Sequence, residues 1–202
     1  MAVKDHSLDE KLIEAARAEF LDKGFRNASL HKIAERAGLT TGAIYTRYKG
    51  KDDLFCSLVQ EILVEAQKQM GPLRERYEAA QKTQDPSKIL DVIRYEEAFY
   101  QTLLSRHYEA CVLFFCRSDG SSLEVTLRTM MEGKTAETVE YLRSISKSDL
   151  DLDGIGLIMT EQYHFFREIL EKGYSQEKAC RCMEVLDRYT EAGWKALLEA
   201  IL

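Results

Sequence analysis

Apolar residues recur along most of this chain at spacings of three and four, the period that gathers side chains on one face of an α-helix. Alternation of apolar and polar residues, typical of strands, is scarce, and only two prolines interrupt the chain. Gly71-Pro72 marks a break, because proline cannot donate a hydrogen bond to the preceding turn. The pattern predicts an all-α fold with helices at about residues 7–24, 30–37, 41–48, 51–70, 73–82, 86–107, 108–116, 122–146, 152–172 and 175–201.

Residues 29–48 predict two short helices joined by a tight turn. Ser29 can cap the first helix with its hydroxyl, and Gly38 can end it in a left-handed conformation. The apolar positions between them are Leu30, Ile33, Ala34 and Ala37. Thr40 or Thr41 can cap the second helix, which exposes small, hydroxylated, aromatic and basic side chains. This is the arrangement of a helix-turn-helix, whose second helix enters the DNA major groove; an ordinary helical hairpin in a core is the alternative.

The flanking segments extend this pattern. An amphipathic helix at 12–20 and Gly24-Phe25 precede it, and Lys51 opens the helix that follows. Together with Ile33-Ala-Glu-Arg-Ala-Gly38 and Thr40-Thr-Gly-Ala-Ile-Tyr45, these features resemble the N-terminal domain of the TetR family of transcriptional regulators. The resemblance covers residues 12–55, roughly a quarter of the chain.

The resemblance implies a non-enzymatic regulator with three parts. These are an N-terminal three-helix DNA-binding domain at 1–50, a linking helix at 51–70, and a C-terminal helical-bundle domain for ligand binding and dimerisation at 71–202. The implied partners are a double-stranded DNA operator, a small-molecule effector and a second copy of the chain. A twofold dimer would read a palindrome with half-sites about one helical turn (~34 Å) apart, or a multiple of that. Repression is the commoner mode of the family.

The same resemblance assigns roles around the second helix. Thr41, Ala43 and Thr46 would contact base edges, and the others would hold phosphates or let the backbone approach closely. The expected DNA-binding residues are Ser29, His31, Thr40, Thr41, Gly42, Ala43, Tyr45, Thr46, Arg47 and Lys51. Two positions depart from the family pattern: Arg47 stands where His is frequent, and Tyr48 where Phe is usual. The first of these departures affects the expected phosphate contact.

Local charge supports a DNA partner. The net charge of −6 at pH 7 would disfavour nucleic acid if it were spread evenly. From Lys23 to Lys51, however, seven basic residues stand against one acidic residue, Glu35, which leaves +6 there and −12 over the remainder. A basic pole on an acidic body attracts the phosphate backbone and fixes the orientation of the protein on it. The cluster therefore favours DNA binding over a helical interaction module with no DNA role.

The remainder of the chain matches the family only in length and helical character, so its effector site is an expectation from the resemblance. Aromatic side chains with a few charged groups suit a mostly apolar ligand, aromatic or cationic. The candidate ligand-binding residues are Arg94, Glu97, Tyr100, His107, Tyr108, Cys111, Phe115, Met131, Tyr163, His164 and Phe166. Each of these residues can instead be plain core.

The last two predicted helices carry more apolar surface than one buried stripe needs, which predicts a partner. By resemblance they would form a four-helix bundle with the same helices of a second copy. The expected interface residues are Ile155, Met159, Phe166, Val185, Tyr189, Ala192, Gly193 and Ala196. Packing within one monomer is the alternative.

Other chemistry is weakly supported. Five cysteines and no expected signal peptide predict free thiols in a cytoplasmic protein, with redox regulation through Cys111 or Cys116 as an alternative function. His107 lies four residues before Cys111, but no third orienting residue accompanies them, so no enzyme is predicted. Cys180 and Cys182 point to different helix faces and make a poor chelate. No metal, cofactor or membrane span is expected.

Overall fold

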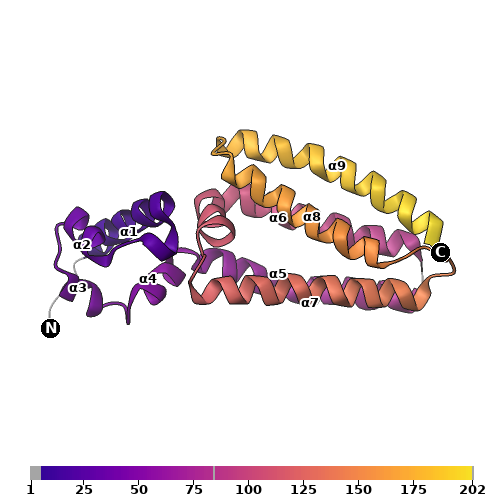
Figure 1. Ribbon diagram of the computed structural model, residues 1–202, viewed down its shortest axis with the longest axis horizontal. Coiled ribbons are helices and arrows are strands. Elements are labelled where there is room, and N and C mark those ends of the chain that lie inside the picture. Colours follow the sequence, from indigo (N-terminus) through magenta and orange to yellow (C-terminus); the bar gives the residue numbers. More distant parts are fainter. Residues whose placement is uncertain (1–5, 84, 202) are drawn as a thin grey trace. The chain divides into compact units, whose positions relative to one another are not determined.

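The computed structural model describes residues 6–83 and 85–201, whose regular structure is entirely helical (Figure 1). The helices are α1 (His6–Asn27), α2 (Leu30–Ala37), α3 (Thr41–Tyr45), α4 (Lys51–Leu58), α5 (Gln60–Thr83), α6 (Pro86–Cys116), α7 (Ser122–Ile145), α8 (Asp153–Glu171) and α9 (Gln176–Ile201). The all-α prediction is confirmed. Within the described residues, no helix is both long and apolar enough to cross a membrane.

The chain forms two compact units. The first consists of Met1–Ile62 with Glu109–Leu127, and the second of Leu63–Tyr108 with Arg128–Leu202. The end of α6 and the start of α7 thus group with the N-terminal helices, although the sequence placed them in the C-terminal part. The functional division at residues 50 and 70 stays a prediction.

An aromatic cluster joins α1 to α4 in the first unit. The ring centroids of Phe20 and Phe55 lie 4.9 Å apart and those of Phe25 and Phe55 lie 5.3 Å apart, each pair edge to face. Ile33 of α2 and Ile44 of α3 are also fully buried. Burying a side chain of this size stabilises a fold by about 1.5–3 kcal/mol, so these residues hold the short helices in place.

The segment between α6 and α7 is fastened to the N-terminal helices at two points. The Phe25 N–H donates to the Arg117 carbonyl at 2.8 Å, and Arg117 Nε donates to the Leu21 carbonyl at 3.0 Å. At the second point, the Asp52 carboxylate accepts from the N–H and the hydroxyl of Ser122, at 2.8 and 2.7 Å. The N-terminal helices are therefore completed by a segment that lies far away in the sequence.

Long helices α5–α9 form the bundle of the second unit, in which α8 and α9 lie alongside each other (Figure 1). Its densest core consists of Ala80, Ile89, Val92, Leu142, Ile145, Leu152, Ile155, Trp194, Leu198 and Ile201. The Lys147 N–H donates to the Ile201 carbonyl at 2.8 Å, which ties the segment after α7 to the end of α9. Helices α6, α7 and α8 all contribute to this core, so it fixes the frame of the cavity described below.

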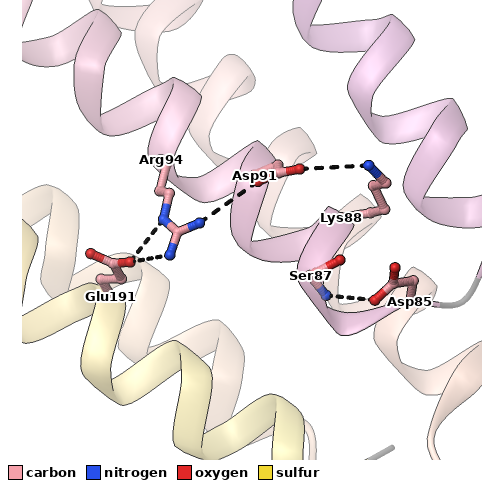
Figure 2. Close-up of polar contacts among 6 residues, drawn as sticks. All are labelled: Asp85, Ser87, Lys88, Asp91, Arg94 and Glu191. Atoms are coloured by element: carbon pink, nitrogen blue, oxygen red, sulfur yellow. Dashed lines mark hydrogen bonds and ion pairs between the residues drawn. The ribbon is translucent and has the colours of Figure 1, made fainter.

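Polar contacts fix the start of α6 and connect it to α9 (Figure 2). The Asp85 carboxylate accepts from the Ser87 N–H at 2.9 Å, and this bond holds the pKa of Asp85 below its usual range. Further along, two nitrogens of Arg94 donate to one oxygen of Glu191, at 2.6 and 2.8 Å, and a third lies 3.7 Å from Asp91. These side chains are about half exposed, so each ion pair contributes at most about 1 kcal/mol.

The predicted helices at 51–70 and 73–82 are wrong. Helix α4 ends at Leu58, where the buried, β-branched Val59 leaves the helical region (φ −112°, ψ 7°). Helix α5 then runs continuously through Pro72. Pro72 lies on the exposed side of α5, where water can solvate the carbonyl that lacks its helical donor. The backbone can therefore stay helical despite the missing N–H.

Two other predicted helix ends coincide with residues whose backbone is not helical. Gly24 (φ 69°, ψ 166°) separates the main part of α1 from its last residues up to Asn27. His107 (φ −134°, ψ 37°) separates two helical parts of α6 at the predicted junction between residues 107 and 108. The sequence therefore located both points at which the helix is interrupted.

Candidate DNA-binding surface and ligand cavity

Local hydrogen bonds shape the helix-turn-helix. The Ser29 hydroxyl accepts from a backbone N–H in the first turn of α2 at 3.5 Å, and its own N–H donates to Glu19 Oε1 at 3.2 Å. Thr40 Oγ1 caps α3 by accepting from the Ala43 N–H at 3.2 Å. Gly38 adopts φ 67°, ψ 31°, which ends α2 as predicted. Each such cap stabilises its helix by about 0.5–2 kcal/mol. Glu19, which is almost fully buried, was not singled out by the sequence.

The residues predicted to contact DNA lie on or beside α3, with Ile44 buried beneath them. Tyr45 is 59% exposed, and Thr46 is exposed while its hydroxyl donates to the Ala43 carbonyl at 2.8 Å. Exposed or half-buried side chains also include Ser29, His31, Thr40, Thr41 and Ala43, and Gly42 is exposed. Burial of Ile44 thus leaves the small and hydroxylated face of α3 open.

Arg47 forms an intramolecular ion pair. Its Nε lies 2.5 Å from Asp9 Oδ1 of α1, and its Nη1 donates to the Ala43 carbonyl at 3.0 Å. The side chains of Arg47 and Asp9 are only 24% and 30% exposed. A phosphate contact by Arg47 therefore requires the guanidinium to exchange Asp9 for a phosphate.

Lys51 is also held within the protein. Its Nζ donates to the carbonyls of Arg26 and Ala28, each at 3.1 Å, and lies 4.7 Å from the centre of the Phe25 ring. The lysine thus ties the start of α4 to the turn between α1 and α2. The phosphate contact that the family resemblance implies for Lys51 stays a prediction.

Besides Lys23 and Arg26, which pair with Asp22 and Asp119, three cations of the basic cluster are exposed: Lys32, Arg36 and Lys49. The sequence counted them in the local charge of +6 but did not include them among the DNA-binding residues. Their positions on α2 and in the loop before α4 provide positive charge close to α3. They are better placed than Lys51 to attract phosphates from solvent.

A cavity lies within the helical bundle of the second unit, with about 120 Å³ accessible to the centre of a water molecule. Its walls are mostly apolar and aromatic, and they come from five helices, α5–α9. The lining residues are Tyr77, Ala80, Ile89, Val92, Ile93, Glu96, Glu97, Tyr100, Met131, Lys134, Thr135, Thr138, Tyr141, Leu142, Met159, Gln162, Tyr163, Phe166, Met183, Leu186, Asp187, Thr190 and Trp194. Apolar walls with a few polar groups are typical of small-molecule sites.

One polar group of the cavity wall is a paired charge. Lys134 Nζ lies 2.7 Å from Glu96 Oε2, and the Tyr77 hydroxyl donates to Glu96 Oε1 at 3.5 Å. Burial by itself would lower the pKa of Lys134, but the adjacent Glu96 carboxylate outweighs it and raises that pKa. Burial, helped by the negative charge of Glu96, raises the pKa of Tyr77 to about 12. Lys134 thus stays charged and is neutralised by Glu96.

The other polar group is acidic and comes from α6 and α9. The Thr190 hydroxyl donates to Glu97 Oε1 at 2.6 Å, and Gln101 Nε2 donates to Asp187 Oδ2 at 2.9 Å. Burial is the main reason that the pKa of Glu97 rises to about 7, with the charges of Asp187 and Glu191 adding to it. Burial also raises the pKa of Asp187. Within the described residues, Asp187 Oδ1 is buried without a hydrogen-bond partner.

The N-terminal residues match a known family. The model of the bacterial regulatory proteins, tetR family, matches residues 12–58, which include both helices of the helix-turn-helix with their caps. Residues 12–58 are therefore similar in sequence to the N-terminal domain of TetR-family regulators. The resemblance inferred from the sequence, and with it the all-α architecture, is confirmed.

Individual relatives match about a third to two fifths of this chain. It is 34% identical over 68 residues to the fatty acid metabolism regulator protein of Bacillus subtilis, which is 34% of this chain and 31% of the relative. It is 35% identical over 85 residues to the HTH-type transcriptional regulator AcrR of Shigella flexneri, or 42% of this chain and 36% of the relative. The matches thus span about a third of each relative's length.

Solved structures extend the likeness in fold to most of the chain. The ketosteroid transcriptional regulator KstR2 of Mycobacterium tuberculosis has a TM-score of 0.59 at 16% identity, with 95% of each chain covered. A TetR-like transcriptional regulator from Rhodococcus sp. RHA1 has a TM-score of 0.56 at 18% identity, over 92% of this chain and 96% of the other. At such identities the likeness concerns the fold alone.

The structure brings five of the predicted ligand-binding residues together at the cavity wall: Glu97, Tyr100, Met131, Tyr163 and Phe166. Three of these come from α6 and α8 as an aromatic group, in which the ring centroids of Tyr100 and Phe166 lie 5.0 Å apart. The polar residues Glu96, Lys134, Asp187 and Thr190 line the same cavity and were missed. In the sequence, each of them could have been found as a charged or hydroxylated residue within an otherwise apolar helix face.

The other six candidates lie elsewhere. Arg94 pairs with Glu191 outside the cavity (Figure 2), and His164 is exposed beside Glu161. The Tyr108 hydroxyl donates to the Tyr174 carbonyl at 2.8 Å, and His107 lies at the kink of α6. The remaining two, Cys111 and Phe115, are buried in the first unit. The sequence analysis selected these residues for their chemistry, but in the structure they lie on helix faces that do not line the cavity.

The predicted dimer residues divide between two faces. Ile155 and Phe166 are 4% and 3% exposed, and Met159 lines the cavity, so in this conformation these three face into their own bundle. On α9 the prediction agrees with an outward face, because Val185 is 70% and Tyr189 74% exposed. Ala192, Gly193 and Ala196 are exposed as well. On α8 the outward apolar residues are instead Leu157, Ile158 and Phe165, which the sequence missed.

Cysteines and metals add no site. The structure records no disulfide among the five cysteines. Cys111 is fully buried and Cys116 is half-buried. Regulation through Cys111 or Cys116 stays an untested alternative, with oxidant access favouring Cys116. Among the residues that the structure describes, no group of three or more His, Cys, Asp or Glu side chains could hold a metal ion.

Proposed function

We propose that this protein is a transcriptional repressor that binds a palindromic operator as a homodimer and leaves it when a small, mostly apolar molecule occupies the cavity. The observation that supports this best is the combination of two features in one chain. A capped helix-turn-helix spans residues that match the TetR model, and a mostly apolar cavity lies within a separate helical unit. The repressor would act in the cytoplasm.

Ligand binding can affect DNA binding only if the ligand prefers one of two conformations. Helix α6 offers a route for this preference, because its first part carries cavity residues Glu97 and Tyr100. Its last turn leads into Arg117, which bonds to Leu21 of α1. A displacement of α6 by the ligand would therefore be transmitted along the chain to the N-terminal helices, with the kink at His107 between the two parts.

In this proposal Thr41, Ala43 and Thr46 contact base edges. Thr40, Tyr45 and the backbone at Ser29 hold phosphates, and His31 lies beside them at the start of α2. Gly42 lets the backbone of α3 approach the DNA closely. Arg47 joins them after releasing Asp9. The structural contacts of Lys51 make Lys49, Arg36 and Lys32 the stronger candidates for electrostatic attraction.

The proposal is tested by selecting duplexes from a random-sequence pool with the purified protein and measuring affinity for the enriched sequence. Tyr45→Phe should weaken binding about fivefold to tenfold on every duplex, because it removes one phosphate hydrogen bond. Tyr48→Phe is the matched control, since Tyr48 is half-buried and lies behind α3. The enriched sequence should be a palindrome, and the complex should contain two chains.

Two results would contradict the proposal. One is a selection that enriches no sequence, together with equal, weak binding of all duplexes by wild type and Tyr45→Phe. A helical interaction module without a DNA role would then be the better description. The other is a single chain bound to an asymmetric site, which would remove the homodimer.

A further inference from the structure

The cavity has an unbalanced charge. Four of its lining residues are charged: Glu96, Glu97, Lys134 and Asp187. Lys134 is already neutralised by Glu96 at 2.7 Å. The neighbouring cation Arg94 is not a lining residue, and both of its short contacts go to Glu191. Glu97 and Asp187 therefore have no cation assigned to them on the cavity wall.

Their position on neighbouring helices makes them one acidic group. Glu96 and Glu97 are adjacent on α6, so they point about 100° apart around the helix. Glu96 thus reaches Lys134 of α7, while Glu97 reaches Thr190 of α9, one turn from Asp187. Thr190 lies beside both residues, since its hydroxyl donates to Glu97 and also lies 3.0 Å from the backbone carbonyl of Asp187. The charge of the Asp187 carboxylate acts on Glu97.

We propose that the cavity binds a lipophilic amine, whose ammonium group lies beside Glu97 and Asp187 and whose apolar part packs against the aromatic wall. The proposal deepens the function proposed above and rests on it, in that the amine would be the effector. Four aromatic side chains on three helices supply the wall: Tyr100, Tyr163, Phe166 and Trp194.

Each part of such a ligand meets a matching surface. An ionised carboxylate in apolar surroundings is costly unless it is paired, so an ammonium group gains more here than a neutral hydroxyl. Aromatic rings add cation–π attraction. A carboxylate ligand would instead meet Glu97 and Asp187 as like charges, and Lys134 is not available to it without breaking its pair with Glu96.

The affinity should depend on pH through the protein. The groups that act on the charge of Glu97 are Asp187 and Glu191 of α9, which disfavour ionisation, and Arg94 of α6, which favours it weakly. Because burial with these neighbours raises the pKa of Glu97 to about 7, the carboxylate that attracts the amine is mostly ionised at pH 8 and mostly protonated at pH 6. An alkylamine stays protonated over this range. Its affinity should therefore rise about tenfold from pH 6 to pH 8.

The test uses three molecules with the same chain: octylamine, octanol and octanoate. Trp194 is the only tryptophan of the sequence and lines the cavity, so its fluorescence reports binding of each molecule to the full-length protein without DNA. Octylamine should bind at least tenfold more tightly than octanol at pH 8, and octanoate most weakly. Glu97→Gln and Asp187→Asn should each reduce this preference about tenfold and leave octanol binding unchanged.

Glu191→Gln is the matched control. Glu191 lies one turn after Asp187 on α9 but pairs with Arg94 instead of lining the cavity (Figure 2). It should keep the preference for octylamine. Octanol binding as tightly as octylamine, or a preference that survives in both Glu97→Gln and Asp187→Asn, would overturn the inference, as would octanoate binding most tightly. Because this readout needs no DNA, failure here leaves the DNA-binding proposal standing, and failure of the operator selection leaves the amine site standing.

Discussion

Arg47 Nε lies 2.5 Å from Asp9 Oδ1, so the residue that follows the recognition segment is bound to the first helix. The pair is partly shielded from solvent, with side chains 24% and 30% exposed. In the proposed complex this guanidinium turns to a phosphate. The ion pair therefore competes with DNA for Arg47.

Asp9→Asn should strengthen binding to every duplex about twofold to fivefold more than Glu10→Gln does. Both changes remove one negative charge from adjacent positions of α1, but only Asp9 bonds to Arg47, and a half-shielded ion pair is worth about 0.5–1 kcal/mol. Affinities are measured by fluorescence anisotropy on specific and unrelated duplexes. In an Arg47→Ala background the advantage of Asp9→Asn over Glu10→Gln should vanish. An equal effect of Asp9→Asn and Glu10→Gln in the wild-type background would show that Asp9 does not restrain Arg47.

Lys51→Met should lower stability, with a loss of about 1–3 kcal/mol in the free energy of unfolding. The reason is that the change leaves the Arg26 and Ala28 carbonyls without their charged donor. Lys49, two residues earlier, has an exposed side chain, so Lys49→Met should change the free energy of unfolding by less than about 0.5 kcal/mol. It should instead lower the affinity for DNA and make that affinity depend less on salt concentration. Urea unfolding and salt-dependent anisotropy on both variants check this. The opposite assignment, with Lys51→Met stable and defective only in DNA binding, would restore the predicted phosphate role of Lys51.

Tyr189→Asp should convert the proposed dimer into a monomer at micromolar concentration. Tyr189 is 74% exposed and lies on the outward face of α9 that also carries Val185, and a charge in the centre of an apolar interface costs about 2 kcal/mol or more. Analytical ultracentrifugation gives the answer directly. Met130→Asp, at a side chain 53% exposed on α7, is the control and should stay dimeric. A Tyr189→Asp protein that remains a dimer would place the interface on another face.

Glu97→Gln should make the protein more stable than wild type at pH 8 and nearly equal to it at pH 5. The folded pKa of Glu97 is about 7 and the ordinary value is 4.5, so between these values the folded state binds more protons and stability falls as pH rises. Glu97 is partly exposed to solvent, so the loss is about 1 kcal/mol after allowing for screening. Urea midpoints at the two pH values measure it. A wild type that gains stability from pH 5 to pH 8 relative to Glu97→Gln would reverse the sign and remove this account of Glu97.

Local features of the helix-turn-helix were predictable because their causes lie within a few residues. The caps Ser29 and Thr40 bond to N–H groups three residues later, and Gly38 supplies a conformation that L residues disfavour. The continuity of α5 was not predictable. The helical signal of its flanks outweighed the missing hydrogen bond of Pro72, and solvent exposure of this residue decided the outcome.

The amino-acid sequence by itself determined the TetR-like pattern of residues 12–58, the all-α architecture, the capped helix-turn-helix and the outward stripe of α9, since each depends on spacing along one helix or turn. Tertiary structure alone decided which side of α8 is buried, because that helix has two apolar stripes, one with Ile155 and Phe166 and one with Leu157 and Phe165. It also decided that Lys51 bonds to distant carbonyls and that five helices enclose Glu97 and Asp187. Such contacts join residues far apart in the chain, and helical periodicity carries no information about which neighbour a face will meet.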